Sequence, residues 1–250
     1  MRTAARIEVC VDSVAGALAA EQGGADRLEL CSALGEGGLT PSAGLIGRVR
    51  ERVRLTLAVM IRPRAGDFLY SDDEFDVMRR DLALAKRLGA DMIVLGLLTA
   101  EGAVDVARTR ELVALARPLP VTFHRAFDMV RDPHAALDDL VGLGVERVLT
   151  SGLERSALEG LDLIAELVRR AAGRILIVPG GGVSERNVAK ILAVSGAPEV
   201  HVSASAPVSS GMTFRNSRVA MGRQYGPSEY AGTVADAGRV AAFRALAGGA

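Results

Sequence analysis

A short pattern that decides the fold of this chain occurs first at residues 24–31, with the sequence GADRLELC. In such a pattern the glycine ends a helix in the left-handed conformation that other residues avoid, and a short loop leads into a strand. The pattern returns at residues 89–95 as GADMIVL and at residues 144–150 as GVERVLT. This recurrence predicts a β/α unit that repeats along the chain.

Working outward from these copies, we predict eight strands, each a short run rich in Val, Ile and Leu, as parallel strands covered by helices require. Segments with helical spacing separate them. Eight units in 250 residues predict a single-domain (β/α)8 barrel of the TIM type, although a Rossmann-like open sheet would use the same loops. The expected strands are Ile7–Val11, Arg27–Cys31, Leu55–Ile61, Met92–Leu95, Val121–His124, Arg147–Thr150, Ile175–Val178 and Val200–Ser203.

No linker-like or low-complexity stretch interrupts the pattern, so we expect one domain over residues 1–250. Its barrel core should cover about residues 6–206, and a C-terminal extension should cover residues 207–250. Within that extension, only Val234–Leu246 has the spacing of a helix.

Charge and composition exclude several classes of protein. The 30 basic and 30 acidic residues cancel, which gives no electrostatic case for binding nucleic acid or an anionic membrane. No apolar run reaches the roughly 18 residues of a membrane span, and the N-terminus has no signal-peptide core. Two cysteines without a disulfide framework suit a reducing compartment, so we expect a cytoplasmic protein.

Strand periodicity places polar side chains inside the barrel, because side chains alternate across a strand. On the first two strands, Glu8 with Cys10 and Glu29 with Cys31 lie opposite purely aliphatic faces, which should meet the helices. Buried ion pairs of this kind can be purely structural. A convergent set indicates a functional site, because buried ionisable groups are costly unless they are satisfied or used. The expected inward set is Glu8, Cys10, Glu29, Cys31, Arg62, His124, His201 and Ser203.

Two arginines, Arg62 and Arg64, directly follow the third strand. Guanidinium groups at a strand end can grip a carboxylate or a phosphate with paired hydrogen bonds. The alternative is an ion pair between Arg62 and Glu29 or Glu8.

His124 ends the fifth strand, and Asp128 follows four residues later. This spacing permits a general acid/base histidine with an orienting carboxylate. Alternatively, Asp128 pairs with Arg125. Glu8 and Glu29 are further candidates for proton transfer, because burial can raise the pKa of a carboxyl group.

Three glycines, Gly180, Gly181 and Gly182, follow the seventh strand and are expected to open a helix. Their backbone N–H groups could approach an anion, although a plain tight turn has the same sequence. The candidate substrate-binding residues are therefore Arg62, Arg64, Arg125, Gly180, Gly181, Gly182, His201 and Ser203.

Cys10 and Cys31 are expected at the ends of adjacent strands, pointing to the same side. Two thiolates are soft ligands that suit Cu(I). The alternative is that both cysteines are small buried hydrophobic residues, as free cysteines commonly are.

The same residues carry a family resemblance. The chain resembles the CutC family of copper homeostasis proteins over residues 6 to about 220, with the motifs in the same order. The matching segments are EVCVDS at 8–13, GGADRLELCS at 23–32, EGGLTPS at 36–42, MIRPR at 60–64, TFHRAFD at 122–128, LTSG at 149–152, PGGG at 179–182, HVSA at 201–204 and MTFRN at 212–216.

This resemblance implies a cytoplasmic TIM-type barrel, a homodimer, that handles copper. It also implies that Cys10 and Cys31 hold Cu(I), since they occupy the two motifs that carry the thiols in copper-binding relatives. The competing hypothesis from the residues is an enzyme that acts on a small anionic, possibly phosphorylated, substrate, with His124, Glu8 or Glu29 moving a proton.

Overall fold

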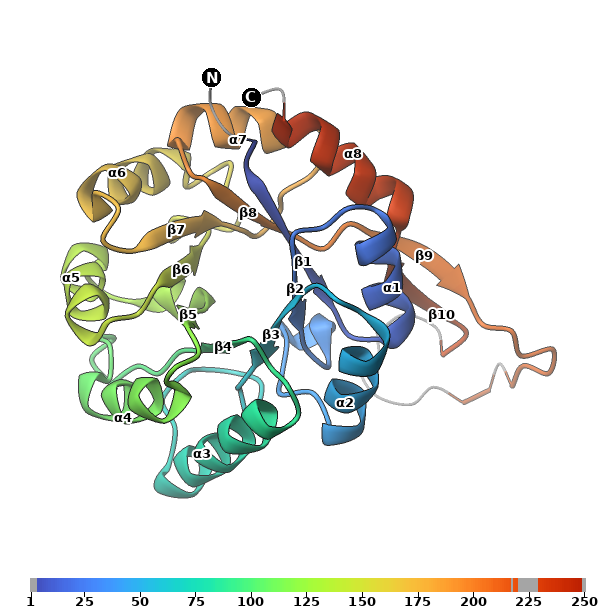
Figure 1. Ribbon diagram of the computed structural model, residues 1–250, viewed down its shortest axis with the longest axis horizontal. Helices are drawn as coiled ribbons and strands as arrows, with labels where there is room; N and C mark the ends of the chain where they lie inside the picture. The colour runs from blue at the N-terminus through green and yellow to red at the C-terminus, as the bar shows by residue number, and fades with distance from the viewer. Residues whose placement is uncertain (1–3, 217, 220–228, 249–250) are drawn as a thin grey trace.

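Eight parallel strands form a nearly closed barrel, and helices surround it (Figure 1). The computed structural model describes residues 4–216, 218–219 and 229–248. The barrel strands are β1 (Arg6–Val11), β2 (Arg27–Leu30), β3 (Thr56–Met60), β4 (Met92–Leu95), β5 (Val121–Phe123), β6 (Arg147–Thr150), β7 (Leu176–Pro179) and β8 (Glu199–Val202). Hydrogen-bonded neighbours run in the order β7-β6-β5-β4-β3-β2-β1-β8, and β8 also lies beside β7. The predicted single-domain (β/α)8 barrel is confirmed, and the open-sheet alternative is wrong.

Helices connect the strands on the outside of the barrel. They are α1 (Val14–Gln22), α2 (Ala43–Arg52), α3 (Asp72–Arg87), α4 (Val106–Ala116), α5 (Pro133–Leu143), α6 (Leu161–Ala171), α7 (Val188–Ser195) and α8 (Ala237–Gly248). Two 3-10 helices, η1 (Leu34–Glu36) and η2 (Arg125–Met129), lie in the loops after β2 and β5. The last helix, α8, closes the outer ring by packing against α7 and α1.

Because side chains alternate between the two faces of each strand, the buried core has two parts. Leu28 and Leu30 are fully buried in the large cluster between strands and helices. The opposite face of β2 points into the barrel, where Cys31 packs in a smaller cluster with Met60 and Met92. The aliphatic and polar faces predicted for the first strands are therefore oriented as expected.

Three glycines mark the recurring loop that precedes β2, β4 and β6. Gly24, Gly89 and Gly144 have φ angles of 83°, 92° and 71°, in the left-handed region that side chains disfavour. These values confirm the helix-end conformation predicted from the repeated sequence pattern.

Helix α3 begins at a capping box. The Ser71 hydroxyl accepts a hydrogen bond from the Glu74 N–H at 3.2 Å, and the Glu74 carboxylate accepts one from the Ser71 N–H at 2.8 Å. Replacing Ser71 with alanine leaves one helix N–H without its partner. We expect the free energy of unfolding to fall by about 1 kcal/mol, as measured by urea denaturation. An unchanged denaturation midpoint would contradict this expectation.

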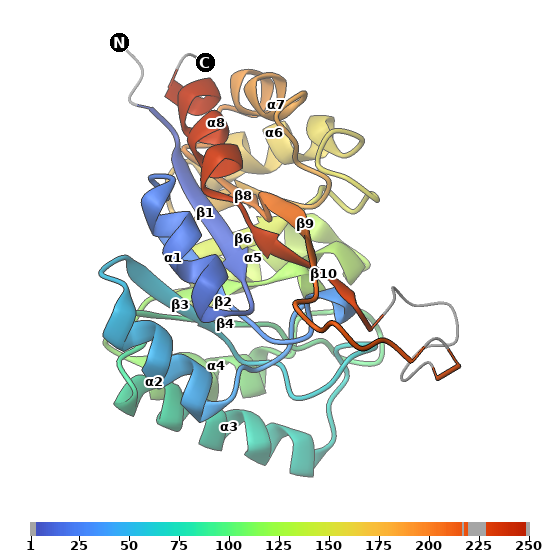
Figure 2. The same ribbon diagram turned by 90° about the vertical axis from the view of Figure 1, so that its right-hand side faces the viewer.

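A two-stranded antiparallel hairpin, β9 (Ser205–Ser209) with β10 (Ala231–Ala235), separates β8 from α8. Figures 1 and 2 show it projecting beyond the barrel. The predicted helix over Val234–Leu246 is wrong at its start, because Val234 pairs with Ala206 in the hairpin. Asp236 instead caps the helix by accepting a hydrogen bond from the Arg239 N–H at 2.9 Å.

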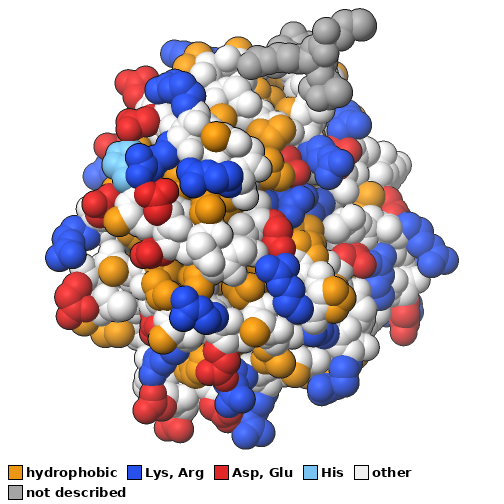
Figure 3. Space-filling model, turned by 60° about the vertical axis from the view of Figure 1, so that its left-hand side comes forward, with side chains coloured by type: hydrophobic (Ala, Val, Ile, Leu, Met, Phe, Trp, Pro, Cys, Tyr) orange, Lys and Arg blue, Asp and Glu red, His pale blue; other side chains and the backbone are white. Residues whose placement is uncertain are grey.

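Basic and acidic side chains are interspersed on the face shown in Figure 3. This mixture agrees with the zero formal net charge of the chain. Within the described residues, no helix has the length and apolar character that crossing a membrane requires.

Candidate functional site

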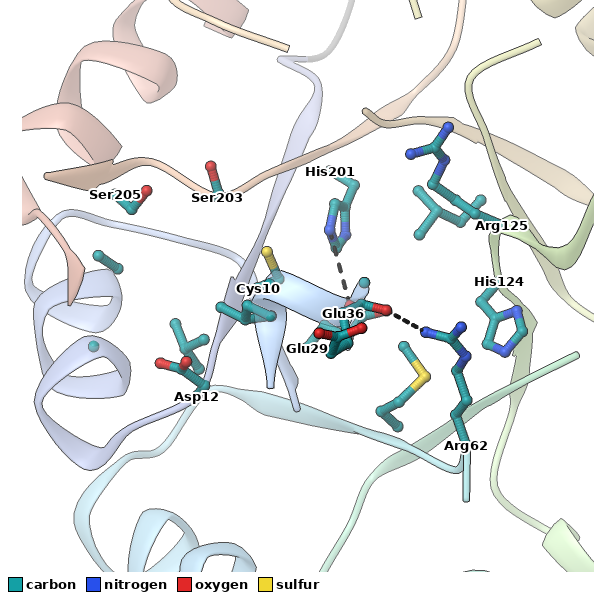
Figure 4. A pocket seen from close by; sticks show the side chains of 18 of the residues that line it. Cys10, Asp12, Glu29, Glu36, Arg62, His124, Arg125, His201, Ser203 and Ser205 are labelled. Atoms are coloured by element: carbon teal, nitrogen blue, oxygen red, sulfur yellow. Dashed lines mark hydrogen bonds and ion pairs between the residues drawn. The ribbon is translucent and has the colours of Figure 1, made fainter. Parts of the chain in front are cut away.

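A cavity of about 580 Å³ opens among the C-terminal ends of the barrel strands. This is the end of the barrel where proteins of this fold place their functional groups. The helix η1 and the β9–β10 hairpin contribute to its wall, and Figure 4 shows polar side chains converging on it from several strands. The residues predicted from sequence that line it are Cys10, Glu29, Arg62, His124, Arg125, Asp128, His201 and Ser203.

His201 lies between two buried carboxyl groups beside this cavity. Its Nδ1 is 2.7 Å from Glu8 Oε1, and its Nε2 is 3.9 Å from Glu29 Oε2. Burial lowers the pKa of His201, but the charges of Glu29 and Cys10 outweigh it and raise that pKa well above its ordinary value. Burial likewise raises the pKa of Glu8, but the His201 hydrogen bond and the Arg27 charge lower it to about 2. The pair is therefore an imidazolium held by a carboxylate.

Cys10 and Cys31 are free thiols on neighbouring strands. Cys10 is paired in register with Glu29, and Cys31 comes two residues after Glu29, directly beyond the end of β2. The Cys31 thiol donates a hydrogen bond to Glu29 Oε2 at 3.5 Å. Burial raises the pKa of Cys31, and the nearby Glu29 charge raises it further. Burial also raises the pKa of Glu29. Both thiols thus adjoin a cluster of acidic groups.

Deeper in the barrel, toward the N-terminal ends of the strands, Arg27 bridges Glu8 of the acidic cluster and Glu199. Its guanidinium donates hydrogen bonds to Glu8 and, at 2.7 Å, to Glu199 Oε2. Arg147 donates to the same Glu199 oxygen at 3.1 Å. The sequence analysis missed these three residues, Arg27, Arg147 and Glu199. Arg27 could have been found, because it shares a strand face with Glu29.

Arg62 does not form an ion pair with Glu29 or Glu8, which was the alternative prediction for this residue. Its guanidinium donates to three backbone carbonyls, those of Glu36 at 2.8 Å, Gly38 at 3.2 Å and Gly66 at 2.9 Å. Among the described residues, no carboxylate oxygen lies within 4.0 Å of it. Its Nε is buried and has no hydrogen-bond partner among the residues that the structure describes. The predicted anion-binding role of Arg62 therefore stays open.

His124 is neutral and has a defined tautomer. Its Nδ1 accepts a hydrogen bond from the Ala126 N–H at 3.1 Å, so the proton of the neutral ring lies on Nε2. Burial, together with the positive charge of Arg62, lowers the pKa of His124 to about 3. The Nε2 atom is buried, and the described part of the chain gives it no hydrogen-bond partner. His124 thus presents an N–H donor at neutral pH.

Asp128 does not orient His124. Its carboxylate accepts hydrogen bonds from Arg125 Nε at 2.7 Å and from the N–H and hydroxyl of Ser151 at 3.0 and 2.9 Å. The predicted histidine–aspartate dyad is wrong, and the alternative pairing with Arg125 is confirmed. The intervening η2 turn is the reason, since His124 caps it through Nδ1.

Arg64 turns away from the cavity, in contrast to Arg62. Its side chain pairs with Glu74 at 2.5 Å and with Asp67 at 2.9 Å, and it lies over the Tyr70 ring. These contacts order the loop that carries Phe68, which does line the cavity. Arg64 therefore positions a wall of the cavity from outside it.

The three glycines after β7 serve close packing. A Cβ at Gly180 would lie 2.5 Å from the Leu149 side chain, and one at Gly182 would lie 2.7 Å from Ser156. The predicted helix start is wrong, because α7 begins only at Val188. The glycines are not part of the cavity lining, so anion binding by this loop stays a prediction.

Two kinds of donor could hold a metal ion beside the cavity. Among the described residues, one ligand atom each from Glu8, Glu29 and His201 lies within 4.8 Å of the others. That oxygen and nitrogen set is already joined as an ion pair. The thiols of Cys10 and Cys31 are soft donors, which fit Cu(I). The fold and these groups define a TIM-barrel protein whose cavity has thiols with adjoining acidic groups in its wall.

Comparison with known proteins assigns the chain to a family within this class. The sequence model of the CutC family matches residues 5–206. A human copper homeostasis protein cutC homolog is 56% identical over 241 residues, covering 96% of this chain and 88% of the relative. A CutC family protein of Chromobacterium violaceum is 50% identical over 238 residues, covering 95% of this chain and 96% of the relative. The chain belongs to the CutC family, as its sequence motifs predicted.

A solved structure supports the same assignment. The crystal structure of a candidate CutC copper homeostasis protein from Streptococcus agalactiae is 34% identical, with a TM-score of 0.76. The match covers 80% of this chain and 98% of that one. An aldolase named QR15, at 14% identity and a TM-score of 0.61, shares the fold alone.

Proposed function

We propose that this protein binds Cu(I) through Cys10 and Cys31 and so takes part in copper handling, as the names of its relatives suggest. The observation that carries the proposal is the placement of two free thiols on one face of neighbouring strands beside the cavity. Two thiolates suffice for Cu(I), which accepts soft ligands and low coordination numbers.

Charge around the thiols supports the same proposal. Glu8 and Glu29 lie within reach of His201 next to the two cysteines, and acidic groups attract a cation. In this proposal Cys31 is the inner ligand, because it is fully buried. Cys10 lines the cavity and is the ligand that incoming metal meets first.

The test is a Cu(I) titration of the reduced protein against a competing chelator. We expect one Cu(I) per chain in the wild type and loss of tight binding in the Cys10→Ser/Cys31→Ser double variant. His124→Asn is the matched control, because it alters the same cavity and leaves both thiols in place. Binding that persists in the double variant would refute the proposal and leave the cysteines as core residues.

An acid/base enzyme is the competing function. It has less support, because Asp128 is engaged by Arg125 and Ser151 instead of orienting His124. Glu29, with a pKa raised by burial, is then the remaining candidate acid.

We also propose that the protein works in the cytoplasm as a homodimer. Free thiols suit a reducing compartment. Apolar side chains are exposed on and beside the hairpin, with Val208 at 47%, Met212 at 58% and Phe214 at 74%. Light scattering after size-exclusion chromatography should give twice the chain mass, and a monomer would refute the dimer.

A further inference from the structure

Two buried N–H donors without partners lie in the wall of the cavity. Arg62 is 6% exposed and His124 is 3% exposed, and both line the cavity. Arg62 Nε and His124 Nε2 each lack a hydrogen-bond partner among the described residues. A buried donor left unsatisfied costs about 1–3 kcal/mol, and no described residue supplies an acceptor to either atom.

Charge indicates what kind of acceptor is needed. The guanidinium of Arg62 is neutralised by no carboxylate in the described part of the chain, since its partners there are backbone carbonyls. His124 adds a neutral donor, because its Nδ1 is used by the Ala126 N–H. A buried charge without a counterion is unfavourable. One uncompensated positive charge with two N–H donors matches a single carboxylate group.

Both donor side chains lie close to the Phe68 ring, at one wall of the cavity. Its ring lies 5.0 Å from the Arg62 guanidinium carbon and 5.1 Å from the His124 ring centre. Figure 4 shows the Arg62 and His124 side chains next to each other, across the cavity from Cys10. Leu34, Met60 and Leu149 add apolar lining. The site therefore joins a polar anchor to apolar walls.

Size separates this site from a metal site. A cavity of about 580 Å³ far exceeds the space that one copper ion occupies, and it falls within the range of small-molecule pockets. The cavity therefore has room for an organic molecule with a body beyond a carboxylate group.

We propose that the cavity binds a small organic carboxylate, whose oxygens accept hydrogen bonds from Arg62 Nε and His124 Nε2 and whose apolar body lies against Phe68. This site is separate from the two thiols and does not depend on copper. It gives the cavity a second ligand, of a different chemical class, at its opposite wall.

Benzoate is a suitable probe, because it combines one carboxylate with an aromatic body, and benzamide is its uncharged counterpart. Titration calorimetry on the reduced, metal-free protein should show saturable one-to-one binding of benzoate and none of benzamide. His124→Asn is the main variant. The asparagine oxygen can still accept from the Ala126 N–H, but the donor at the Nε2 position is lost.

Arg62→Lys is the second variant, since it keeps the charge and removes the Nε donor. Each variant should weaken benzoate binding roughly tenfold or more, the value of a hydrogen bond to a charged group. Arg80→Gln removes an arginine on the exposed face of α3 and should leave binding unchanged. Near-ultraviolet circular dichroism confirms that each variant is folded.

Three results would overturn the proposal. The first is a wild type that does not bind benzoate saturably, and the second is wild-type affinity in both His124→Asn and Arg62→Lys. Tighter binding of inorganic phosphate than of benzoate would overturn the assignment to a monocarboxylate. The two proposals can fail independently, because His124→Asn should lose benzoate binding and keep Cu(I) binding.

Discussion

Replacing Arg27 with methionine is expected to lower the free energy of unfolding by about 3–5 kcal/mol, the cost of breaking a buried ion pair from one side. Arg27 is 4% exposed and holds Glu8 and Glu199, which are each 2% exposed. Methionine fills much of the same volume but removes the charge that Glu8 and Glu199 share, which leaves each buried carboxylate with one fewer cationic partner. Urea denaturation at neutral pH measures the loss.

Two further variants make the reason testable. Arg48→Met removes an exposed partner of Glu51, and its effect should stay within about 1 kcal/mol, as for most surface pairs. Adding Glu8→Gln and Glu199→Gln to Arg27→Met should recover part of the lost stability. The two buried negative charges that Arg27 compensated are then no longer present. A loss below 1 kcal/mol in Arg27→Met alone would contradict the network's structural role.

Local periodicity was sufficient to predict much of the barrel and part of the cavity lining. Alternation along β1 and β2 identified the inward faces that carry Glu8, Cys10, Glu29 and Cys31. These inferences need only neighbouring residues on one strand. The left-handed glycines could be predicted for the same reason, because a helix end is a local event.

Long-range partners could not be read from the same patterns. Arg27 and Glu199 are 172 residues apart, and their contact depends on the stagger of β8 against β2 through β1. The alternation rule gives a side-chain direction but not a depth along the barrel. For the same reason, the sequence could not show that Arg62 would be held by carbonyls instead of by Glu29.

The hairpin was missed because its strands have no strong apolar alternation. The segments SAPVS at 205–209 and AGTVA at 231–235 are made mostly of small residues, and residues 210–230 separate them in the sequence. Propensity in such strands is weak, and contact with the partner strand decides their conformation. Residues of this hairpin, such as Val234, nevertheless form part of the cavity wall.

Acidification should destabilise the protein through His124. Its pKa is about 3 in the folded chain, against an ordinary value of 6.5 when the chain is unfolded. Between these values the unfolded state takes up a proton that the folded state does not, so stability falls as the pH falls from 6.5 to 3. Each step of one in pKa corresponds to about 1.4 kcal/mol, so the loss due to His124 is on the order of 4 kcal/mol.

The measurement is urea denaturation at several pH values between 6.5 and 3, on the wild type and two variants. Carboxyl groups also titrate in this window, so the informative quantity is the difference in slope between proteins. His124→Asn removes the buried imidazole and should flatten the decline by that amount. His134→Asn makes the same chemical change at a side chain that is 38% exposed, and its slope should follow the wild type. Equal slopes in wild type and His124→Asn would mean that the folded and unfolded states bind the His124 proton equally well, and a pKa lowered by burial would then be wrong.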